Sequence, residues 1–444
     1  MRFNEFRTIL GLWQHLGVIA VQNTHQPHPI EIIMLKSLYW IVGMSTVLST
    51  SSAQTNLALA RELFDKYENF KMSAITSRRF SQADMLKWLD PLRDQKLFVM
   101  TPVGRSAEGR TISMLKLGAG KTTVLLWSQM HGDESTATMA IMDMLKFFSQ
   151  QPDHIITQSI LDKLNLLIIP MLNPDGAERF QRRTAQSIDM NRDALALRTP
   201  EARILKETRD TYRPQFGFNL HDQDPRYSVG ETRNVSAIAL LAPAFDESRS
   251  DNGVRLPAKK VAATIASVLH EFIPKNVSKY DDAFEQRAFG DNIQKWGTST
   301  VLIESGGWPG DREKMFIRKL NCVVLLTTLH GIAADQCEHA DVKVYEQLPF
   351  NTKYFYDIIL RNAQLEANDA VPPITVDIGI NIDEEFNPQT RHAELVAKVV
   401  DIGDLRTYGA FQDVDVQGVV VTGAEIKIEQ RIPMDKVDSI LKKK

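Results

Sequence analysis

Apolar side chains recur at helical spacing ahead of residue 95. Within residues 57–70, Leu63, Tyr67 and Phe70 lie four and three residues apart, which places them on one face of an α-helix. Residues 81–92 show the same spacing. The pattern therefore predicts one helix over 57–70 and a second over 81–92.

From residue 98 onward, short apolar runs alternate with longer helical patterns. The runs predict strands at 98–100, 112–117, 123–127, 164–170, 216–220 and 299–303. The helical patterns predict helices at 135–149, 259–272 and 313–333. Because strands that alternate with helices of this length are typical of a covered parallel sheet, we expect an α/β fold. Its sheet should be mixed, mostly parallel, with helices on both faces.

The pattern changes past residue 345. Residues 374–382, 393–401 and 414–432 cluster or alternate β-branched side chains and are separated by Gly and Asn-Pro, which is typical of strands and turns. We therefore expect an α/β domain over 54–345 and a small β-rich C-terminal domain over 346–444.

Residues 34–53 have the pattern of a secretory signal peptide. Lys36 precedes an apolar stretch, and Ser51 and Ala53 supply small residues at the cleavage positions. The stretch is about eleven residues long, too short for a stable membrane span, which needs about twenty. We expect translation to begin at Met34, residues 1–33 to be a non-native extension, and the product to be periplasmic or secreted. A surface helix of an intracellular protein is the alternative.

Charge and cysteine content exclude two classes of protein. The net charge is −3, and no run of Lys and Arg is interleaved with aromatic residues, so nucleic-acid binding is not predicted. Two cysteines, Cys322 and Cys337, are too few for a disulfide framework. Cys322 lies in an apolar run and is expected to be a buried small side chain, with a bridge to Cys337 as the alternative.

A histidine and a glutamate follow one predicted strand at metal-ligand spacing. His131 and Glu134 stand three residues apart between the strand at 123–127 and the next helix. His221 follows another buried strand, at the carboxyl end where open α/β sheets carry their sites. Catalytic zinc sites use three N or O ligands and leave one position for water. Each signal alone is weak; together they predict a zinc site.

Two further segments carry polar residues. Asn173-Pro-Asp-Gly176 is a turn signal, and Asn191-Arg192 follows it. An arginine guanidinium can bind a substrate carboxylate with two parallel hydrogen bonds. The simpler interpretation is that Arg192 forms a salt bridge on the protein surface. Glu304 ends the strand at 299–303 and precedes two glycines. A carboxylate there can take a proton from a zinc-bound water, or can merely pair with a cation.

This ordered set resembles the zinc carboxypeptidases of the carboxypeptidase A type, over roughly residues 80–335. The resemblance implies that His131, Glu134 and His221 bind one zinc ion and that peptides are hydrolysed at their C-terminus. It implies Glu304 as general base and acid. Arg182, with Arg183 as the alternative, would polarise the scissile carbonyl.

The same resemblance implies the substrate contacts. Asn191 and Arg192 would hold the terminal carboxylate, and Tyr280 would be the mobile tyrosine that closes over the substrate, although its surroundings match the family poorly. The residue at the base of the specificity pocket would lie within 289–291. Two alternatives stay open: a zinc-dependent deacylase of N-acyl amino acids, which shares a similar centre, and a binding module without activity.

Overall fold

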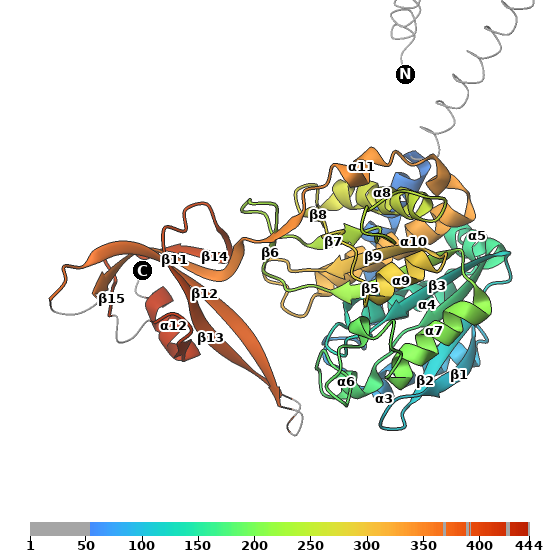
Figure 1. Ribbon diagram of the computed structural model, residues 1–444, viewed down its shortest axis with the longest axis horizontal. Helices are drawn as coiled ribbons and strands as arrows, with labels where there is room; N and C mark the ends of the chain where they lie inside the picture. The colour runs from blue at the N-terminus through green and yellow to red at the C-terminus, as the bar shows by residue number, and fades with distance from the viewer. Residues whose placement is uncertain (1–53, 367–369, 388–389, 391, 423–426, 443–444) are drawn as a thin grey trace, which may run out of the picture. The chain divides into compact units, whose positions relative to one another are not determined.

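The computed structural model describes residues 54–366, 370–387, 390, 392–422 and 427–442 (Figure 1). The segments expected to be a non-native extension (1–33) and a signal peptide (34–53) lie outside the described residues. Contacts within the chain group Ala53–Lys444 into one unit. The expected domain boundary near residue 345 therefore stays a prediction.

A mixed sheet of eight strands is the centre of the fold. Its order is β1-β2-β4-β3-β5-β9-β7-β8. The strands are β1 (Val99–Arg105), β2 (Thr111–Leu117), β3 (Thr122–Ser128), β4 (Leu164–Ile169), β5 (Phe216–Asp222), β7 (Ile238–Leu241), β8 (Val277–Lys279) and β9 (Ser299–Ser305). Strands β4, β3, β5 and β9 run parallel, and the pairs β1–β2, β2–β4 and β7–β9 are antiparallel. The expected mixed, mostly parallel sheet is confirmed.

Helices cover both faces of this sheet because its strands are apolar on both sides. In β3, Val124 and Leu126 belong to the core on one face, whereas Leu125 and Trp127 belong to the core on the other, as the period of two requires. The helices are residues 54–70, α3 (Gln82–Asp94), α4 (Thr136–Gln150), α5 (Ile155–Lys163), α6 (Pro174–Glu178), α7 (Pro200–Tyr212), α8 (Arg255–Phe272), α9 (Phe289–Lys295), α10 (Met315–Ala333) and α11 (Lys343–Glu346).

Helix α10 is the one helix in the described part of the chain that is long and apolar enough to cross a membrane. However, 83% of its apolar window is buried inside the protein, and its apolar side chains belong to the larger core. Cys322 lies on α10 and is fully buried, as expected from its apolar surroundings. Cys322 and Cys337 are both free thiols.

Most predicted elements are present, with extended ends. The predicted strand at 216–220 continues through His221 to Asp222, and the one at 299–303 continues to Ser305. Because β3, β5 and β9 are parallel neighbours, their carboxyl ends meet at one edge of the sheet (Figure 1). His131, His221 and Glu304 therefore stand at the same edge.

The region past residue 350 is β-rich, as predicted. A six-stranded sheet has the order β14-β11-β12-β13-β16, with β15 paired to β11. Its elements are β11 (Phe355–Glu366), β12 (Ile374–Asn387), β13 (His392–Gly403), β14 (Gly409–Asp415), β15 (Val420–Thr422), β16 (Arg431–Ile432) and α12 (Met434–Lys442). This C-terminal sheet has a core of its own, built around Ile358, Leu360 and Ile378. A short strand before it, β10 (Asn351–Lys353), pairs with β6 (Tyr227–Val229).

Candidate metal centre

A loop of seven residues between β3 and α4 carries His131 and Glu134. The segment Asn173–Glu178 forms hydrogen bonds to this loop. The Asn173 backbone N–H donates to the Gln129 carbonyl, and the Asn173 side-chain amide donates to the Met130 carbonyl. A Cβ on Gly132 would lie 2.0 Å from the Gly176 carbonyl carbon. The Asn-Pro-Asp-Gly segment, expected to be a turn, instead begins the short helix α6, with Asn173 as its N-cap, and supports the loop.

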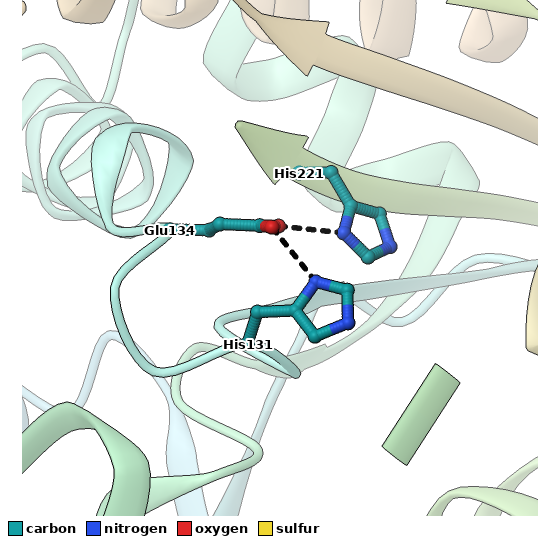
Figure 2. Close-up of side chains that lie close together, drawn as sticks. All are labelled: His131, Glu134 and His221. Atoms are coloured by element: carbon teal, nitrogen blue, oxygen red, sulfur yellow. Dashed lines mark hydrogen bonds and ion pairs between the residues drawn. The ribbon is translucent and has the colours of Figure 1, made fainter. Parts of the chain in front are cut away.

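His131, Glu134 and His221 converge on one point. Among the described residues they form a group whose ligand atoms all lie within 4.8 Å of one another. Figure 2 shows both imidazole rings presenting Nδ1 to the Glu134 carboxylate. The His131 Nδ1 lies 2.8 Å from Oε1 and the His221 Nδ1 lies 2.7 Å from Oε2. All three side chains are buried.

Burial and mutual charge set the pKa values of this cluster. Burial opposes ionisation of Glu134, but the two imidazoles hold its pKa well below the ordinary value. Burial disfavours a charged His131, yet Glu134 and Asp189 raise its pKa to about 9. Burial lowers the pKa of His221, and Glu134 only partly offsets this. A buried carboxylate shared by two imidazoles is a strong site for a cation.

Glu304 lies beside His221 on the neighbouring strand. The register of β5 and β9 pairs His221 with Glu304 directly. The Glu304 side chain is buried, and within the described chain its Oε2 atom has no hydrogen-bond partner. Burial first, and the nearby Glu134 second, raise its pKa to about 8. A carboxyl group in this state can take up and release a proton near neutral pH.

Arg182 points at the cluster and Arg183 points away from it. Nη1 of Arg182 donates to Glu134 Oε1 at 2.9 Å, while its Nε and Nη2 donate to Asp189. Arg183 donates to the Ser187 carbonyl on the exposed side of the loop. The guanidinium of Arg182 is thus a cation available to a group bound at this centre.

Sequence reasoning missed the role of Asp189. Its Oδ1 lies 3.0 Å from Nε2 of His131, and its Oδ2 accepts from Arg182. Asp189 therefore orients the imidazole so that Nδ1 faces Glu134, as carboxylates commonly do for metal-binding histidines. The signal was its place two residues before Asn191, but only the fold brings it to His131.

A cavity of about 780 Å³ opens at the cluster, and Asn191, Arg192, Tyr280, Asp291 and Glu304 line it. The Asn191 side chain accepts from the Phe289 backbone N–H. The Arg192 Nε lies 3.6 Å from Glu285, and its side chain is about one third exposed. Burial and the charge of Glu304 raise the pKa of Tyr280 above its usual value, so its hydroxyl is protonated.

Sequence comparison finds relatives of the segment that carries most of this centre. The family model described as zinc carboxypeptidase matches residues 85–240. Residues 85–240 are therefore similar to zinc carboxypeptidases. Carboxypeptidase 2 of Trichophyton tonsurans is 26% identical over 246 residues, covering 52% of this chain and 43% of the relative. Carboxypeptidase 2 of Trichophyton rubrum is 26% identical over 244 residues, with the same coverage of both chains.

The matched part of the chain spans less than half the length of these relatives. A metallo-carboxypeptidase from Burkholderia cenocepacia is a structural neighbour with a TM-score of 0.46 and 18% identity; the match covers 58% of this chain and 69% of that one. Carboxypeptidase A from Helicoverpa armigera has a TM-score of 0.46 and 15% identity, covering 63% and 80%.

Proposed function

We propose that this protein is a zinc-dependent carboxypeptidase that removes the C-terminal residue of a peptide. The observation that carries the proposal is the convergence of His131, Glu134 and His221 beside Glu304, at the carboxyl ends of parallel strands, where open α/β sheets carry their sites. The family match does not favour the deacylase alternative, and the presence of Glu304 at the centre disfavours a binding module without activity.

The donor set fits one zinc ion. Two imidazole nitrogens and one carboxylate face one another in a buried site, and zinc accepts N and O ligands in catalytic sites of this kind. Asp189 fixes the ring of His131 from the far side. When bound, the ion would polarise the scissile carbonyl and increase the acidity of water.

The protein's own side chains would move the proton and stabilise the charge. Glu304 takes a proton from the attacking water at its unpaired oxygen and passes it to the nitrogen of the leaving amino acid. Arg182 donates to the carbonyl oxygen as negative charge develops on it, an interaction that is often the largest electrostatic contribution. Both side chains already face the cluster.

The 780 Å³ cavity would receive the terminal residue. Arg192 presents its guanidinium there and Asn191 lies beside it, so that a terminal carboxylate can be held by charge-assisted hydrogen bonds. Tyr280 contributes a hydroxyl to the same cavity. Among residues 289–291, Asp291 supplies the polar group that would meet the terminal side chain.

Replacement of Glu304 by Gln tests the proposal. The amide keeps the size of the side chain but cannot accept the proton, so turnover of N-blocked dipeptides should fall by about 10²–10⁴-fold. Zinc content should stay unchanged, because Glu304 is not in the ligand set. Equal activity of wild type and E304Q would exclude Glu304 as the base. Faster hydrolysis of N-acyl amino acids than of peptides by the wild-type protein would favour the deacylase.

We also infer that the protein is exported to the periplasm or secreted, with 54–345 as catalytic domain and 346–444 as C-terminal domain. The inference on export depends on the signal-peptide pattern at 34–53. N-terminal sequencing of the exported protein should find a mature chain that begins near residue 54; a mature chain that begins near Met1 would contradict it.

A further inference from the structure

A second cavity adjoins the metal centre on the side away from Asn191 and Arg192. It has a volume of about 660 Å³, within the range of ligand-binding cavities. Glu134, Arg182 and Asp222 line both cavities. A molecule that reaches the metal centre from the first cavity can therefore continue into the second, which the proposed removal of a terminal residue leaves unexplained.

The C-terminal sheet forms one wall of this second cavity. Its lining residues from that sheet lie on three strands: Asp357 and Ile358 on β11, Ile382, Asp383 and Glu384 on β12, and Phe411 and Gln412 on β14. The opposite wall includes Phe180, Pro225 and Trp308. The cavity thus lies between two sequence regions that are more than 40 residues apart.

Ion pairs hold the C-terminal sheet in this place. Glu384 accepts from Arg78 at 2.6 Å and also contacts Arg79, and its side chain is only 13% exposed. Arg226 donates to Asp383 at 2.9 Å. Because these pairs are partly buried and several charges meet in each, they are worth more than isolated surface pairs.

The sheet also packs against the loop that follows Glu304. A Cβ on Gly307 would lie 2.8 Å from Cζ of Phe411 and 2.7 Å from the Pro225 carbonyl oxygen. Gly307 is three residues from Glu304, so β14 is in contact with the segment that ends the catalytic strand. The wall supplied by the C-terminal sheet is therefore close to the reacting centre.

The second cavity also offers hydrogen-bonding capacity. Asp222 accepts from Thr136 and Lys314 through one oxygen. Its other oxygen is buried and unpaired within the described chain. A buried acceptor without a partner costs free energy unless a bound group donates to it, and an extended peptide presents backbone N–H groups at regular intervals.

We propose that the C-terminal sheet is part of the substrate site: it encloses a channel for the peptide segment that precedes the scissile bond. The proposal rests on the carboxypeptidase function proposed above. With the terminal residue in the first cavity, the chain before it must leave past Arg182 and Asp222, into the second cavity. The preferred substrate is then a peptide of several residues, bound in extended form.

A pair of substrates tests this channel. One is an N-blocked dipeptide; the other is a peptide of about six residues, roughly 20 Å when extended, with the same last two residues. For the zinc-loaded full chain, kcat/KM should be higher for the longer peptide. Gln412→Trp enlarges an exposed residue of β14 that lines the second cavity. It should lower the ratio of long to short kcat/KM by about tenfold.

Two control variants separate binding from folding. Val420→Trp adds the same side chain at an exposed position of the C-terminal sheet outside the channel, and the ratio should not change. Glu384→Ala removes the carboxylate that pairs with Arg78 and Arg79 and should lower the ratio of long to short kcat/KM. Glu385→Ala removes an exposed partner of Arg431 and should leave that ratio unchanged. An unchanged ratio in both Gln412→Trp and Glu384→Ala would overturn the proposal.

Binding distinguishes this inference from the proposed function. If zinc-loaded wild type cleaves neither peptide, the carboxypeptidase proposal fails. The channel is then judged by the Kd of the longer peptide, which Gln412→Trp should raise about tenfold and Val420→Trp should not. Equal Kd values in wild type and Gln412→Trp would refute the channel by itself.

Discussion

Asp291 is a buried acid in the cavity proposed for the terminal residue. It lies on α9, its side chain is 7% exposed, and its Oδ1 accepts from the Glu285 backbone N–H. Burial raises its pKa to about 7. Its carboxyl group is therefore neutral below pH 7 and charged above it. A cationic side chain in the cavity would favour the charged form.

From this we predict a pH-dependent preference for a C-terminal Lys over a C-terminal Leu. The ratio of kcat/KM for the two substrates should rise by about tenfold between about pH 6 and pH 8, as Asp291 ionises. Using a ratio cancels the ionisation of groups that act on both substrates. In Asp291→Asn the ratio should be low and independent of pH. A wild-type pH profile in this variant would exclude Asp291 from specificity.

Side-chain chemistry was predicted from sequence where a residue stands at the end of a strand. His221 and Glu304 end apolar runs, and His131 follows one, so their place at one sheet edge could be read from the pattern. Asp189 and Asp222 could not be assigned roles in this way, because their partners lie far away in the sequence: Asp189 contacts His131, and Asp222 contacts Lys314.

At the scale of elements, the β3–α4 loop depends on the short helix α6. The two segments touch where Gly132 meets Gly176, and a methyl group has no space there: Cβ would lie 2.0 Å from the carbonyl carbon of Gly176. The backbone of α6 would have to shift, and His131 lies next to the affected residue. The geometry of the metal centre therefore depends on this contact between two backbones.

Gly132→Ala should weaken zinc binding and lower the free energy of unfolding by about 1–3 kcal/mol, the usual cost of overpacking. Chelator competition measures the first effect and urea unfolding the second. Gly253→Ala is the matched control, since a Cβ at Gly253 meets nothing within 4 Å; its effect should stay within about 0.5 kcal/mol. Equal zinc affinity of the two variants would show that the contact does not position His131.

Long periodic elements were predicted from sequence and short ones were missed. The helices at 135–149 and 313–333 were expected within a few residues of α4 and α10, because their apolar positions repeat over several turns. Strands β7 and β8, with four and three residues, are too short to show a period. Helix α7 is mostly polar and helix α9 has only seven residues. Neither therefore shows an apolar pattern long enough to predict a helix.

At the scale of the whole molecule, a buried ion pair joins distant segments. Arg318 on α10 is 2% exposed and donates to Asp143 on α4 at 2.6 and 2.7 Å. Its remaining N–H groups donate to the Met72 and Ile75 carbonyls, and Tyr67 donates to Asp143. The pair thus connects the first described helix and the segment after it to the central core.

Asp143→Ala should lower the free energy of unfolding by about 3–5 kcal/mol, because it leaves the Arg318 guanidinium buried without a counter-ion. Chemical unfolding of the full chain measures this. Lys66→Ala breaks an exposed pair with Glu62 and should cost at most about 1 kcal/mol. If the two variants were equally stable, the buried pair would not be what connects the N-terminal segment to the core.

The contacts of the C-terminal sheet lay beyond sequence reasoning. The pattern of β-branched residues predicted a β-rich region, and the sheet confirms it, but Glu384 pairs with Arg78 across 306 positions of the chain. No local pattern distinguishes Glu384 from Glu385, although only Glu384 meets the arginines of the α/β region. Such pairings are set by the final fold.

Anomalous X-ray scattering at the zinc edge tests the central claim most directly. In crystals of the zinc-loaded protein, we predict one strong peak about 2.0–2.2 Å from Nδ1 of His131, Nδ1 of His221 and a carboxylate oxygen of Glu134. The preparation used for the crystals should first be shown to cleave peptides. If its zinc-loaded crystals then gave no anomalous peak among these three side chains, the result would contradict the account.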